Sequence, residues 1–142
     1  MNHFMKGYSV RLKIIFPVFI LLLTKTATAQ NNIPLLEIDT VREHLALSEG
    51  QYKTVNKIVE QIKRILEQDH KIIADLKARF KSGDEPGFFE KIKVKQARDG
   101  RVDRIDKLFE SINNHLNDKQ KIRFKEVEKP VLRSLSKKEL TE

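Results

Sequence analysis

The sequence has no cysteine and no tryptophan, and only five of its 142 residues are glycine. The lack of cysteine excludes a disulfide scaffold, a zinc site with thiolate ligands and a cysteine nucleophile. No glycine-rich loop and no low-complexity segment interrupts the chain. Long apolar runs are also missing, since Ile14–Leu23, with ten residues, is far below the roughly 20 that span a bilayer.

That apolar run belongs to the three-part pattern of a secretory signal peptide. Basic residues without any acid precede it, and Ala27–Ala29 is a small-x-small cleavage signal before Gln30. We therefore expect residues 1–29 to be removed and residues 30–142 to form one exported domain without a transmembrane anchor. The periplasm is the expected location, although a signal peptide alone also permits secretion into the medium.

The charge of the chain changes once residues 1–29 are set apart. Four of the 28 Lys+Arg and none of the 20 Asp+Glu lie in that segment, so the net charge falls from +8 to +4. Export and the mixture of acids and bases argue against a nucleic-acid partner. Charged residues outnumber apolar ones in the remainder, whereas a compact globule of this size has more apolar residues. This composition favours elongated amphipathic helices.

Apolar residues recur at helical spacing over most of the mature chain. Val55, Ile62 and Leu76 share one seven-residue repeat, which predicts a helix from Glu49 to Lys81. A dense group of helix breakers, Ser82–Gly87, ends it. The remaining expected segments are a loose lead-in at Gln30–Thr40, a helical turn at Thr40–Ala46, a second helix at Pro86–Asn113, and a third from Asp118 to about Leu135, which Pro130 kinks or ends early.

These segments predict an all-α fold: a long antiparallel helical hairpin with shorter flanking helices and no strand. Folding the chain at its breakers sets Asp69 beside Gly100 and Arg101. Asp69 occupies a heptad position that apolar residues otherwise fill. We expect a polar layer in which Asp69 faces Arg98 or Arg101, Gly100 allows a close approach, and the helix register is fixed.

One short motif occurs twice, 69 residues apart. Leu47-Ser48-Glu49-Gly50-Gln51 is repeated as Leu116-Asn117-Asp118-Lys119-Gln120, and each copy opens an expected helix. Both copies are capping boxes, in which Ser48 or Asn117 caps the helix and Gln51 or Gln120 reaches back to the backbone of the cap residue. Two good helix starts, without any chemistry, account for these residues as local signals.

The whole arrangement resembles the LTxxQ-motif family of periplasmic proteins, which includes Spy-like and CpxP-like chaperone and envelope-stress proteins. The resemblance rests on both motifs, and on Lys121 and Phe124 after the second, and it covers about residues 45–132. Asn117 stands where the family motif has threonine or serine. The resemblance implies an all-α hairpin that forms a curved homodimer and binds unfolded or sensor proteins without ATP.

Metal and enzyme chemistry have little support in the sequence. His44, His70 and His115 have no second histidine at helical spacing, so we expect no metal site and no cofactor. No nucleophile–base pair or buried acid pair stands out, and we expect no enzymatic activity.

Two features around the second helix are candidates for binding polypeptides. One is a basic run of Lys91, Lys93, Lys95, Arg98 and Arg101. This run is either a solvated helix face or a patch that attracts acidic or unfolded polypeptide, an anionic lipid surface or a sensor domain. The other is Phe88 and Phe89, adjacent aromatics that cannot both face one seam because helix neighbours point about 100° apart. These rings serve either core or dimer packing, or contact with clients.

The function expected from these observations is an exported, ATP-independent chaperone or stress-response protein. It would bind unfolded or partner polypeptides on a basic, partly apolar helical surface. Two alternatives remain open. One is a regulatory adaptor of a membrane stress sensor, and the other is a periplasmic metal-responsive protein.

Overall fold

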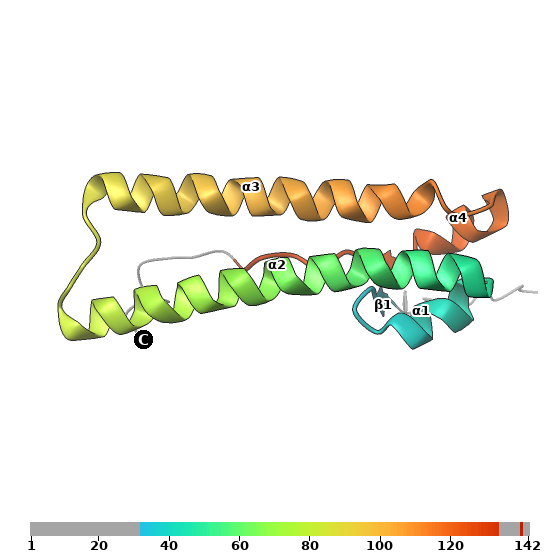
Figure 1. Ribbon diagram of the computed structural model, residues 1–142, viewed down its shortest axis with the longest axis horizontal. Coiled ribbons are helices and arrows are strands. Elements are labelled where there is room, and N and C mark those ends of the chain that lie inside the picture. The colour runs from blue at the N-terminus through green and yellow to red at the C-terminus, as the bar shows by residue number, and fades with distance from the viewer. Residues whose placement is uncertain (1–31, 134–139, 141–142) are drawn as a thin grey trace, which may run out of the picture.

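A computed structural model describes residues 32–133 and residue 140, and these residues form the expected all-α hairpin (Figure 1). Helix α2, Glu49–Ser82, and helix α3, Phe88–Asn113, lie side by side and antiparallel. We call the end with the connecting turn the distal end. The expected signal peptide, residues 1–29, lies outside the described residues, and the curved dimer stays a prediction.

The opposite, proximal end carries two short helices. Helix α1, Ile38–Leu45, covers α2, and helix α4, Asp118–Phe124, follows α3 and contacts α1 (Figure 1). The breakers end α2 as the sequence predicts: Gly83, with φ of 80°, is in the left-handed region that glycine adopts without steric cost. The N–H groups of Gly83 and Asp84 donate to the carbonyls of Phe80 and Arg79, which closes the helix end.

The hydrophobic core lies at the proximal end. Ile62 and Ile105 meet there from the two long helices, and both are almost fully buried. Phe124 of α4 stacks on Phe109 of α3 with ring centroids 4.8 Å apart. The core consists of Leu35, Val41, Leu45, Leu47, Val55, Ile58, Val59, Ile62, Ile65, Ile105, Ile112, Leu116, Phe124 and Val127. None of these residues belongs to the distal halves of α2 and α3.

The expected third helix is wrong in length, because α4 ends at Phe124, well before Pro130. The chain turns there and forms strand β2, Val127–Glu128, parallel to strand β1, Ile33–Pro34. The expectation of no strand is therefore also wrong. The N–H of Ile33 donates to the carbonyl of Glu126 at 2.9 Å, so this pairing replaces the helical bonds that α4 would otherwise continue.

The lead-in before α1 is likewise more ordered than the sequence predicts. Leu35 is only 1% exposed, its N–H donates to the carbonyl of Glu128, and α1 already begins at Ile38. Burial of Leu35 beneath α1 and α2 stabilises this segment despite Pro34. Within residues 32–133 and 140, no helix has the length and apolarity needed to cross a bilayer.

Candidate functional site

Both copies of the repeated motif form complete capping boxes. The Ser48 hydroxyl accepts from the Gln51 N–H at 3.3 Å, and the Gln51 side-chain oxygen accepts from the Ser48 N–H at 3.1 Å. Asn117 and Gln120 make the same two bonds at 3.0 and 2.9 Å. Leu47 and Leu116, which precede the caps, are buried in the core. Each box therefore ties a helix start to the hydrophobic interior.

The two boxes also bind each other, which the sequence reasoning missed. The Gln51 amide donates to the Gln120 carbonyl oxygen at 2.9 Å, and the Gln120 amide donates back at 3.1 Å. The remaining amide hydrogens reach the backbone carbonyls of His115 and Ala46. This reciprocal pair joins α2 to α4 across 69 residues of sequence. The available signal was the repeat itself, since two identical glutamines at two helix starts form a symmetric amide pair when those starts meet.

The polar layer brings Asp69, Arg98 and Arg101 together in the middle of the hairpin. Asp69 is 2% exposed, and its carboxylate accepts two hydrogen bonds from Arg98, each at 3.0 Å. The Nε of Arg101 donates to the same carboxylate at 3.0 Å, while its buried Nη2 lies 2.9 Å from it without making a hydrogen bond. Arg98 also donates to the backbone carbonyl of Arg133, so the layer reaches the segment after β2. A role in fixing register stays a prediction.

Gly100 takes no part in this layer. A Cβ atom built at Gly100 would meet nothing within 4 Å, and the residue is exposed. The hypothesis that Gly100 allows a close helix approach is therefore wrong, because the long arginine side chains span the gap between the helices themselves.

The basic run does not form one continuous patch. The side chains of Arg98 and Arg101 are only 12% and 11% exposed, since both turn inward to Asp69. Lys91 is exposed and pairs with Glu85 at 2.6 Å. Lys93 and Lys95 are both exposed. The cationic surface is thus carried by lysines near the distal end and excludes the two arginines.

Phe88 and Phe89 are both exposed, at 72% and 77%. Their rings meet edge to face with centroids 5.6 Å apart. Neither ring belongs to the core, and Ile92, one turn later, is also partly exposed. We call Phe88, Phe89, Ile92, Lys93 and Lys95 the distal surface.

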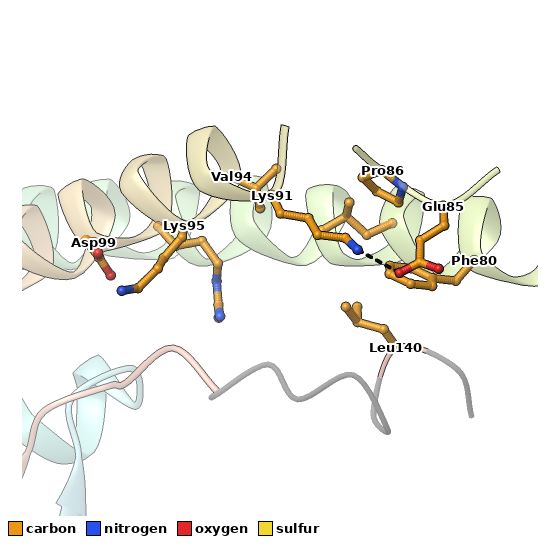
Figure 2. A pocket seen from close by; sticks show the side chains of 10 residues that line it. Phe80, Glu85, Pro86, Lys91, Val94, Lys95, Asp99 and Leu140 are labelled. Atoms are coloured by element: carbon orange, nitrogen blue, oxygen red, sulfur yellow. Dashed lines mark hydrogen bonds and ion pairs between the residues drawn. The ribbon is translucent and has the colours of Figure 1, made fainter. Parts of the chain in front are cut away.

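Beside the distal surface, a cavity of about 560 Å³ opens between α2 and α3 (Figure 2). Leu76, Phe80, Pro86 and Val94 supply its apolar walls. Lys91 reaches across to Glu85 at its edge, as the dashed line in Figure 2 marks. Its volume lies within the usual range of ligand pockets, about 300–1,000 Å³.

Ion pairs hold the distal turn. Arg79 of α2 donates to Glu90 of α3 and to Asp84 in the turn. The hydrogen bonds from Arg79 lower the pKa of the Glu90 carboxyl, and those carboxylates raise the pKa of Arg79. A lowered folded-state pKa means that this pairing stabilises the turn above the ordinary pKa of glutamate and is lost in acid. The two helices are therefore connected at the tip by charge rather than by apolar packing.

Residues 32–133 and 140 contain no group of three or more His, Asp or Glu placed to hold a metal ion. No known family model, no curated protein and no solved structure matches this chain. We take the distal surface, with its exposed rings and lysines, and the cavity beside it as the candidate site.

Replacing Gln120 with alanine tests the amide pair. The Gln51 amide and the Ala46 carbonyl lose their partner in a site where Gln120 is 6% exposed, so we expect a loss of about 1–3 kcal/mol in the free energy of unfolding. Urea unfolding measures it, with Gln96→Ala on the exposed side of α3 as the matched control. Equal urea midpoints for Gln120→Ala and Gln96→Ala would show that the amide pair of Gln51 and Gln120 does not stabilise the fold.

Replacing Asp69 with leucine tests the polar layer. Two buried guanidinium groups then lose their counter-charge, and we expect destabilisation by about 3–5 kcal/mol in urea unfolding. Asp75→Leu, at an exposed position of the same helix, is the control and should change stability by less than about 0.5 kcal/mol. An Asp69→Leu protein as soluble, uniquely folded and functional as the parent would contradict a role of the polar layer in stabilising the hairpin and fixing its register.

Proposed function

We propose that this chain is an exported, ATP-independent chaperone or stress-response protein that binds unfolded or partner polypeptides on the distal surface. The observation that carries the proposal is the exposure of two adjacent phenylalanines, Phe88 and Phe89, at 72% and 77%. Contiguous apolar side chains that remain exposed on a folded protein commonly mark interaction sites. Lys95 of the distal surface also lines the cavity with apolar walls, so an incoming chain would find a second apolar feature next to the same part of α3.

Charge supports the same surface. Lys93 and Lys95 lie on the turns of α3 that follow the two rings. Positive charge raises the rate at which acidic or unfolded chains approach, and apolar contact then holds them. Because Arg98 and Arg101 are bound to Asp69, the proposed binding set contains the lysines and the aromatic residues alone.

The size of the apolar contact favours weak, reversible binding. A phenylalanine side chain buries about 150–250 Å² when it is fully covered, so two of them give about 8–12 kcal/mol of gross burial energy at about 25 cal/mol per Å². Association costs about 4–15 kcal/mol in lost translational and rotational freedom, and ordering a flexible partner adds to this cost, which leaves little net affinity for a single contact. A chaperone that works without nucleotide has to release its clients spontaneously, and such an affinity permits it.

Suppression of aggregation tests this proposal. Residues 30–142 are mixed with a reduced, aggregating model protein without nucleotide, and light scattering is followed at low and moderate salt. We expect suppression at near-stoichiometric ratios that weakens with salt, because exposed charges are screened over about 10 Å at 0.1 M.

Matched variants assign the effect to the distal surface. We expect Phe88→Ser with Phe89→Ser, or Lys93→Glu with Lys95→Glu, to raise the amount needed for half suppression by roughly fivefold, about 1 kcal/mol of lost contact. Ile122→Ser, at a side chain 67% exposed on α4, and Lys119→Glu with Lys125→Glu are the controls. No suppression by the folded parent at several-fold excess would reject the chaperone proposal.

A further inference from the structure

The cavity beside the distal surface already contacts a distant part of the chain. Leu140 lines it together with Phe80, Leu76 and Val94, and Figure 2 places Leu140 directly beneath the Phe80 ring. Leu140 is the one apolar wall residue that comes from neither α2, α3 nor their turn. It is half-buried, although it lies far beyond the last strand in sequence.

A second contact holds the start of the same segment on the hairpin. The backbone carbonyl of Arg133 accepts a hydrogen bond from Arg98, whose side chain also lines the cavity. Arg98 is fixed in turn by Asp69, which is nearly fully buried. Two points of the C-terminal segment, Arg133 and Leu140, are thus attached to the same side of the hairpin.

The cavity is larger than one leucine needs. Its volume of about 560 Å³ remains with Leu140 already in its wall. Lys91, Lys95, Glu85 and Asp99 give its edge charges of both signs. An apolar side chain with charged residues beside it in the sequence, as Leu140 has, fits these walls, and the same description applies to an apolar residue of an unfolded polypeptide.

We infer that the cavity is a binding site, here called the seat, for leucine-type side chains of extended polypeptides, and that Leu140 of the same chain is its resident ligand. The inference rests on the proposed function, because Leu140 then competes with clients for the cavity beside the distal surface. A tethered ligand acts at millimolar effective concentration, so even a weak contact occupies the seat for much of the time. The apparent affinity for a client falls by the fraction of molecules in which the seat is free.

A fluorescence reporter tests whether Leu140 occupies the seat. The sequence has no tryptophan, so Phe80→Trp introduces a single emitter in the cavity wall. We expect its emission to move to the red when Leu140→Asp is added, because water replaces the leucine beside the ring. Val131→Asp, at a side chain of the same segment that is 73% exposed, is the control and should leave the emission unchanged. No shift with Leu140→Asp would overturn the inference.

A second measurement is independent of the reporter. In the full mature chain, nuclear Overhauser contacts between Leu140 methyl protons and Phe80 ring protons are expected, and their absence would overturn the inference even if Phe80→Trp failed to fold.

Competition is tested by client binding. We expect Leu140→Asp to bind the aggregating model protein about two- to tenfold more tightly than the parent or Val131→Asp, since the tethered competitor is lost. Equal affinities would overturn the competition. If neither parent nor variant bound the client, the proposed function would fail, and the emission shift and the nuclear Overhauser contacts alone would decide whether Leu140 is the ligand of the cavity.

Discussion

The buried carboxylate of Asp69 is the constraint on which the rest of the hairpin depends. It is 2% exposed and bound by Arg98 and Arg101, so α2 and α3 cannot slide past each other without leaving charges unpaired away from water. We therefore expect a shift in the register of the two helices to carry an electrostatic cost. Through Arg98 the same layer also binds the backbone carbonyl of Arg133.

The polar layer separates two halves of the molecule that are built differently. On the proximal side lie the hydrophobic core, the strand pair and the reciprocal amide bonds of Gln51 and Gln120. On the distal side the helices are joined by the ion pairs of Arg79, and Leu76 is the only core-type residue of α2. Stability concentrated at one end allows apolar side chains to stay exposed at the other. We propose that this division is what permits polypeptide binding.

Local signals in the sequence predicted much of this architecture. The heptad pattern of Val55 and Ile62 and the breakers at Ser82–Gly87 predicted α2, its end and the hairpin, because both depend on residues close in sequence. The hairpin geometry also set Asp69 opposite the arginines. The length of α4 could not be predicted, since it depends on the pairing of Val127 with Ile33 from the other end of the chain.

The distal features were predictable only in part. The sequence indicated that Phe88 and Phe89 could not both face one seam, but it did not reveal that both are exposed. It placed Arg98 and Arg101 in the polar layer and also in a basic patch, and the buried carboxylate decides between the two. The contact of Leu140 with the cavity had no sequence signal, because one leucine in a charged segment has no periodicity.

Hydrogen–deuterium exchange of the mature chain, with and without a permanently unfolded polypeptide, tests the central claim most directly. The account predicts slower exchange on binding in the distal residues 76–99 and unchanged exchange in α1 and α4, whose backbone is held by the core. Protection confined to α1 and α4, or no change anywhere while the polypeptide is bound, would contradict the account.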